Sequence, residues 1–326
     1  MIEPRANPNF LGHEQAIASL VHAAGSGRLH HGWLISGQPG IGKATLAFRF
    51  ARWLLAGAAT PDLSLPETHP VFRRVAAGTH PDLFTIERRI NEKTDKLQSV
   101  IVIETVREAI QFMHHTAAEG GWRVVIIDGA ETMNPQTANA LLKILEEPPP
   151  RAILLLVSAA PGRLLPTIRS RCRALPLAGL ADDSVEQLLA DYAPDLGRPE
   201  RMQLAQLAEG SIGTALNLAA EGGLSLAGLV DEALSAAVAP ERAQNIADTV
   251  ARQVEGADKF ETFFNLLRAG LAARTRAAAR SAQRPENLAG QVTLWQDLSK
   301  LEREVIGLNL DKRAAIIVAL SQLHGS

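Results

Sequence analysis

Cysteine is almost absent from this chain of 326 residues, which excludes some metal sites and gives no sign of an oxidising compartment. Cys172 is the single cysteine, so it cannot form an internal disulfide or complete a four-cysteine zinc site. The first residues, Met1 to Pro8, contain no apolar signal core. The longest apolar run, Ala152 to Ala160, is far too short to span a membrane. We therefore expect a cytoplasmic protein that binds no zinc and has no membrane segment.

An excess of charge of either sign is also absent. The formal net charge is −2, and the content of 46% apolar and 21% charged residues is ordinary for a globular protein. This balance argues against an electropositive nucleic-acid binder that acts alone. Seven of the 33 basic residues are lysines, so locally basic surface would consist mainly of arginine. The length is sufficient for two or three domains, each with its own core.

Strand and helix patterns alternate as far as residue 178, and only helix patterns follow. Short apolar runs that suit strands buried on both faces of a parallel sheet lie at residues 33–35, 83–86, 124–128, 153–158 and 173–177. Helix patterns lie between them at 45–55, 103–115 and 136–147, whereas 57–82 and 87–96 are predicted to be irregular. The sequence therefore predicts an α/β parallel-sheet domain over 1–178, a small helical domain over 179–223 and a helical bundle over 224–326.

Residues Gly37 to Lys43 match the phosphate-binding loop G-x-x-x-x-G-K-[ST] as far as its lysine. Gly37, Gly40 and Gly42 would allow backbone N–H groups to surround a phosphate, and the start of the next helix would add its positive dipole end. Lys43 would reach the outer phosphates. The alternative is a glycine-rich turn with a surface lysine, but strand, loop, lysine and helix follow in the order that the motif requires. The pattern therefore predicts a nucleotide-binding fold.

The groups that would hold Mg²⁺ are incomplete. Ala44 stands where the motif requires a hydroxyl, and Thr45 comes one residue late, which turns its side chain by about 100° around a helix. Asp128 ends an apolar run that is typical of a Walker B strand, whose aspartate would hold Mg²⁺, although a plain acid at a strand end is the alternative. Gly37, Gly40, Gly42, Lys43, Thr45 and Asp128 thus form a degenerate site that could hold ATP or ADP.

Three longer motifs carry a family resemblance, at residues 28–37, 138–149 and 165–172. On these motifs the chain resembles the clamp-loader subunits of bacterial DNA polymerase III, which are AAA+ proteins, and among them the delta-prime type. The resemblance covers residues 1–220 well. It implies a five-subunit loader that places a ring-shaped sliding clamp on primed DNA. The implied partners are motor (gamma/tau) and clamp-opening (delta) subunits, the clamp and DNA phosphates.

We expect His30 and His31 to be solvated loop residues rather than neighbours of a nucleotide base.

The same resemblance gives a role to an arginine. Ser170, Arg171 and Cys172 match a Ser-Arg-Cys motif whose arginine is supplied in trans, as a finger, to the ATP of a neighbouring subunit. Without the resemblance, Arg169, Arg171 and Arg173 would be interpreted as solvated loop arginines. With it, Arg171 is the predicted finger.

Two departures from the family pattern point away from an ATPase. Hydrolysing AAA+ proteins place a glutamate directly after the Walker B aspartate, but this chain has Gly129, and Glu131 cannot be assumed to replace it. Clamp-loader motors carry a sensing arginine where this chain has Gly213. We therefore expect a subunit that needs no cofactor, is no enzyme on its own, braces the ring and donates Arg171. An active gamma/tau-like motor or related DNA helicase stays the alternative, and a signalling or storage nucleotide binder would leave the Ser-Arg-Cys motif unexplained.

Overall fold

The computed structural model describes residues 3–27, 29–88, 90–91, 96–97, 100–252, 259–280 and 288–323. Its contacts divide the chain into two compact units. The first comprises residues 1–188 together with 209–213, and the second comprises 189–208 together with 214–326. The division into an α/β domain, a small helical domain and a C-terminal bundle stays a prediction.

The first unit is built on a five-stranded sheet with the order β2-β5-β6-β1-β7. All neighbouring strands pair in parallel: β1 (Gly32–Ser36), β2 (Leu83–Ile86), β5 (Arg123–Asp128), β6 (Ala152–Ser158) and β7 (Arg173–Pro176). Successive side chains point to opposite faces, so Val124 and Ile126 lie in one hydrophobic core while Val125 and Ile127 lie in the other. Burial on both faces explains why these strands are continuous apolar runs, and the predicted α/β fold is confirmed.

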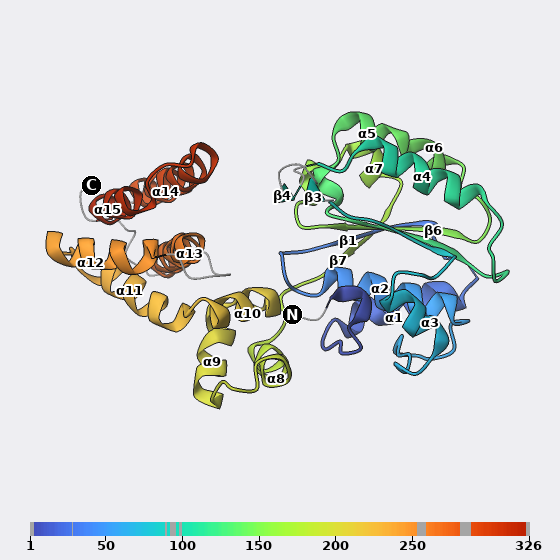
Figure 1. Ribbon diagram of the computed structural model, residues 1–326, viewed down its shortest axis with the longest axis horizontal. Helices are drawn as coiled ribbons and strands as arrows, with labels where there is room; N and C mark the ends of the chain where they lie inside the picture. The colour runs from blue at the N-terminus through green and yellow to red at the C-terminus, as the bar shows by residue number, and fades with distance from the viewer. Residues whose placement is uncertain are drawn as a thin grey trace. The chain divides into compact units, whose positions relative to one another are not determined.

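Helices cover both faces of this sheet (Figure 1). One face carries α1 (Glu14–Gly25), α2 (Lys43–Leu55) and α3 (Pro70–Ala76). The opposite face carries α4 (Ile103–His114), α5 (Pro135–Ala140), α6 (Leu142–Glu146) and α7 (Pro166–Arg169). Three short 3₁₀ helices, η1 (Pro4–Ala6), η2 (Ala130–Thr132) and η3 (Pro161–Arg163), complete the connections.

Helix α3 lies inside the segment 57–82, which the sequence pattern predicts to be irregular. The prediction is wrong there because the helix is only seven residues long and its apolar side chains are buried by distant parts of the chain, although its first residues carry local capping signals. The ring of His69 caps the helix by accepting a hydrogen bond from the backbone N–H of Val71, and Pro70 occupies the first helical position. The helix then buries Val71, Phe72 and Val75.

Two other predicted segments also differ in the structure. The helix predicted over 136–147 is divided at Leu141, whose N–H bonds to the carbonyl of Ala138 in a tighter 3₁₀-type turn. The segment 87–96, predicted to be an exposed loop, contains β3 (Ile90–Asn91), which pairs antiparallel with β4 (Lys96–Leu97). Residues 89 and 92–95 lie outside the described part of the chain.

The described residues of the second unit form helices joined by turns and loops, with no strand among them, which confirms the predicted helical C-terminal part. Helix α8 (Asp182–Tyr192) leads into it. The following helices are α9 (Arg198–Leu207), α10 (Ile212–Ala220), α11 (Gly223–Ser235), α12 (Pro240–Ala251), α13 (Lys259–Arg280), α14 (Leu288–Leu308) and α15 (Lys312–Gln322). Phe260, Phe263 and Phe264 on α13 are completely buried and form its aromatic core. Among the described residues, no helix is both long and apolar enough to cross a membrane.

Candidate functional site

The predicted phosphate-binding loop lies between β1 and α2, at the carboxyl end of β1. Gly37, Gly40 and Gly42 have φ angles of 152°, 74° and 96°, which side-chain-bearing residues rarely adopt. Gly42 is the N-cap residue of α2, so Lys43 is the first residue of that helix. The three glycines therefore make a loop that bends sharply into a helix N-terminus, which is the geometry that a phosphate site needs.

This loop is closed against the segment 209–213 of the same unit. The N–H of Gly213 donates to the carbonyl of Gly40 over 2.9 Å, and the Ser211 hydroxyl donates to the carbonyl of Pro39 over 2.9 Å. A Cβ atom on Gly213 would lie only 2.8 Å from the Cα of Gly40. No side chain can therefore be added at residue 213 without moving the loop, and an arginine there is incompatible with this arrangement.

Lys43 is bonded to its own loop. Its Nζ donates to the carbonyl of Gln38 over 2.6 Å, and the residue is only 8% exposed. Burial lowers the pKa of Lys43, while the negative charges of Asp128 and Glu131 oppose that shift. Burial raises the pKa of Asp128 at the end of β5, and the lysine charge acts against this increase. The opposite charges of Lys43 and Asp128 thus act on each other's pKa, and each opposes the effect of burial.

Glu131 lies closer to this site than its place in the sequence suggests. One of its carboxylate oxygens accepts a hydrogen bond from the N–H of Ala159, just after β6, over 3.1 Å. Its negative charge acts against the lowering of the Lys43 pKa by burial. Sequence spacing could not show this, because a 3₁₀ turn that begins after Gly129 folds the chain back.

Ala44 and Gly129, where the sequence lacks a Mg²⁺-binding hydroxyl and a water-activating carboxylate, have no side chain that could supply either group. Ala44 and Thr45 are the second and third residues of α2, and both are half-buried. Gly129 has a φ of 73°, a backbone conformation that favours glycine and would strain a glutamate placed there. Gly129 is therefore suited to the turn that it makes rather than to the position of a water-activating carboxylate.

The Ser-Arg-Cys motif connects α7 to β7. The Ser170 hydroxyl donates to the carbonyl of Thr167 over 3.1 Å, and Cys172 is buried, which raises the pKa of its thiol to about 12. Between these anchored neighbours, the Arg171 side chain is 36% exposed. Its guanidinium is therefore accessible from the surface, as a residue that acts on a neighbouring molecule requires.

The other two arginines of this segment are placed differently. Arg169 is exposed at the end of α7. The Arg173 guanidinium carbon lies 5.0 Å from the ring centroid of Trp33, a cation–π distance. The three arginines, which would all be interpreted as solvated loop residues without the family resemblance, therefore have three different environments.

His30 and His31 differ from the predicted solvated loop residues, because both are partly buried. Their rings stack with centroids 4.4 Å apart. The Nε2 of His31 donates to the carbonyl of Leu145, at the end of α6, over 2.9 Å. Burial lowers the pKa of His31, and the neighbouring His30 acts in the same direction, so His31 is neutral near pH 7. This pair therefore connects the start of β1 to the end of α6.

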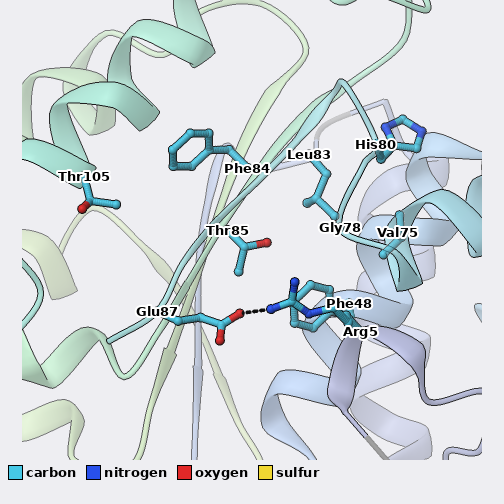
Figure 2. Close-up of a pocket in the computed structure, with 10 residues that line it drawn as sticks. All are labelled: Arg5, Phe48, Val75, Gly78, His80, Leu83, Phe84, Thr85, Glu87 and Thr105. Carbon is cyan, nitrogen blue, oxygen red and sulfur yellow. Dashed lines mark hydrogen bonds and ion pairs between the residues drawn. The ribbon is translucent and has the colours of Figure 1, made fainter. Parts of the chain in front are cut away.

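A cavity of about 350 Å³ lies elsewhere in the first unit, at the outer strand β2 (Figure 2). The ion pair between Arg5 and Glu87, 2.6 Å long, lies at this cavity, beside Phe48 and Thr85. Its lining residues include none of those predicted for the nucleotide site or for the Ser-Arg-Cys motif. The predicted chemistry is therefore not located in this cavity.

The described residues contain no group of three or more His, Cys, Asp or Glu side chains that could hold a metal ion. We expect elemental analysis of the purified chain to give far less than one zinc per molecule. Cys172 is the single thiol, and burial raises its pKa to about 12, which disfavours the thiolate that zinc binds. A known zinc protein carried through the same purification serves as the positive control. Stoichiometric zinc in this chain would contradict the prediction.

Comparison with known proteins supports the resemblance. Residues 12–181, just over half of the chain, match the family described as DNA polymerase III, delta subunit. DNA polymerase III subunit delta' of Pseudomonas aeruginosa is 41% identical over 194 residues, which are 59% of this chain and 56% of that protein. The subunit delta' of Escherichia coli is 35% identical over 54% of this chain and 48% of its own length.

A motor-type relative also matches. Subunit tau/gamma of Haemophilus influenzae is 30% identical over 66% of this chain and 30% of its own length. The chain spans only about half the length of the delta-prime relatives. Its sheet, its phosphate-binding loop and its Ser-Arg-Cys motif nevertheless lie within the matched residues 12–181. The predicted resemblance is confirmed, and the chain belongs to the DNA polymerase III delta subunit family, with delta-prime subunits among its relatives.

Proposed function

We propose that this chain is a non-hydrolysing, delta-prime-like subunit of the DNA polymerase III clamp loader. In this role it braces the cytoplasmic ring that places the sliding clamp on primed DNA, and it donates Arg171 to the ATP site of a neighbour. Its partners are the motor (gamma/tau) and clamp-opening (delta) subunits, together with the clamp. Primed DNA is contacted in the assembled complex, mainly through phosphates. The delta-prime relatives and the exposed Arg171 support this proposal.

The closed phosphate-binding loop is the observation that carries the non-hydrolysing part. Gly213 lies directly against Gly40, which leaves no room for a sensing arginine, and Ala44 supplies no hydroxyl for Mg²⁺. Phosphoryl transfer depends almost entirely on positioning and charge neutralisation. A site without these groups is therefore expected to hold ATP or ADP without hydrolysing ATP.

We expect steady-state ATP turnover by the isolated chain to be negligible, with and without primed DNA and clamp. The reason is the combined lack of the Mg²⁺ hydroxyl, the water-activating glutamate and the sensing arginine. A purified gamma/tau motor subunit, assayed in parallel, is the positive control. The single repair Ala44→Thr is expected to restore no turnover, because Gly129 and Gly213 stay unchanged.

The motor alternative is favoured by one observation, the charge interaction of Glu131 with Lys43. A motor that used Glu131 to activate water would turn over ATP robustly, and Glu131→Gln would abolish that activity. Robust ATP turnover by the unmodified chain would therefore contradict the non-hydrolysing proposal and favour an active motor subunit.

A further inference from the structure

The Arg171 side chain is already held by its own subunit. Its Nη2 lies 2.7 Å from a carboxylate oxygen of Glu146, and its Nη1 donates to the carbonyl of Thr167 over 3.1 Å. A guanidinium has five N–H donors, so these two bonds leave three donors for another partner. Arg171 is therefore oriented without being saturated.

Glu146 stands on a fixed part of the backbone. It is the last residue of α6, and the hydrogen bond from His31 to the carbonyl of Leu145 holds the preceding residue. A Cβ atom on Gly32 would lie 2.9 Å from a Leu145 methyl carbon, and 3.5 Å from the carbonyl oxygen of Arg171. The start of β1, the end of α6 and the Ser-Arg-Cys motif therefore lie close together, and a side chain at Gly32 would have to displace Leu145.

The ion pair adds little to folding stability. About half of the Glu146 side chain and about a third of the Arg171 side chain are exposed, and exposed ion pairs are strongly screened by solvent. An exposed arginine that is not held samples many rotamers, however, and each must be given up when the side chain orders. The pair can therefore influence a reaction more than it influences the fold.

We propose that Glu146 is a positioning residue for Arg171. Its carboxylate orients the guanidinium at the subunit surface before the neighbour's ATP binds. The hydrogen bond from His31 to the carbonyl of Leu145 fixes the backbone beside Glu146. The proposal rests on the proposed function, in which Arg171 acts on a neighbouring ATP. Glu146 touches no substrate, so its effect passes entirely through Arg171.

The test is a double-mutant cycle in rebuilt clamp-loader complexes, read as ATP turnover stimulated by DNA and clamp. Glu146→Ala is expected to lower the rate at the site facing this subunit about three- to tenfold, the range that corresponds to ordering one long side chain. Because the interaction positions a group for the reaction, kcat should fall while the KM for ATP stays nearly constant. The conservative variant Glu146→Gln keeps an acceptor oxygen and should retain part of the rate.

Two comparisons separate positioning from a merely structural role. The neighbouring exposed Glu147 provides the matched control, and Glu147→Ala should leave turnover unchanged. In an Arg171→Ala background, Glu146→Ala should have no further effect, because the group that it positions is gone. A structural role would instead lower the rate in both backgrounds and weaken assembly of the complex.

The outcomes also distinguish this inference from the proposed function. If Arg171→Ala impairs turnover while Glu146→Ala matches the wild type or exceeds it, the positioning role is overturned and the finger stands. If Arg171→Ala itself has no effect, the finger is wrong and the positioning role falls with it. Equal losses from Glu146→Ala in both backgrounds would also overturn the inference.

Discussion

A clamp loader rebuilt with Arg171→Ala in this subunit is expected to assemble normally but to lose ATP hydrolysis at the one site that faces it. A guanidinium is always charged and presents a rigid fork of donors, which suits the charge that develops on the γ-phosphate. Fingers supplied in trans change the rate by roughly 10³- to 10⁵-fold. Sites elsewhere in the ring should continue to work, so total turnover should fall only by the share of this site. The measurement is turnover stimulated by DNA and clamp.

Two variants sharpen this experiment. Arg171→Lys should rescue poorly, because a lysine ammonium keeps the charge but lacks the planar fork. Arg169→Ala is the matched control, since Arg169 is exposed two residues away on the same connection and should tolerate the change. Wild-type turnover with Arg171→Ala, in a complex of normal composition, would show that Arg171 is one more solvated arginine.

Removal of residues 224–326 is expected to abolish entry of the chain into the complex while leaving the first unit folded. We expect the helical bundle over 224–326 to make most of the oligomer contacts, because its described helices expose large apolar side chains. On α14, Val292 and Trp295 are 47% and 42% exposed, and their spacing of three residues places them on one helix face. Exposed apolar side chains grouped in this way are typical of a protein interface.

The pair Val292→Asp and Trp295→Asp tests the same surface without a truncation. A tryptophan at the centre of an interface contributes about 2 kcal/mol or more, so affinity for the partner subunits should fall at least ~30-fold. Gln296→Asp adds a charge at an exposed position of the same helix and is the control for charge alone. The measurement is the dissociation constant of the complex that the chain forms with the motor and clamp-opening subunits. Unchanged affinity in both the truncation and the double variant would locate the oligomer contacts elsewhere.

The sequence by itself determined the features that depend on neighbouring residues. The order of strand, glycine loop, lysine and helix predicts β1, Lys43 and α2 because each of these elements is formed by local interactions. The start of α5 was also predictable, since Asn134 caps it with a side chain that accepts from the N–H of Thr137 over 2.8 Å. The buried strands were recognisable because burial on both faces demands uninterrupted apolar runs.

Only the tertiary structure decided what the predicted site residues touch. The Ser211 hydroxyl reaches the carbonyl of Pro39 across 172 residues of sequence, and His31 reaches Leu145 across 114. Parallel strands are joined by long crossovers, so residues that meet at one edge of the sheet lie far apart in the chain. No local pattern records such a meeting. For that reason the closed phosphate-binding loop and the ion pair between Glu146 and Arg171 became visible only when the chain was folded.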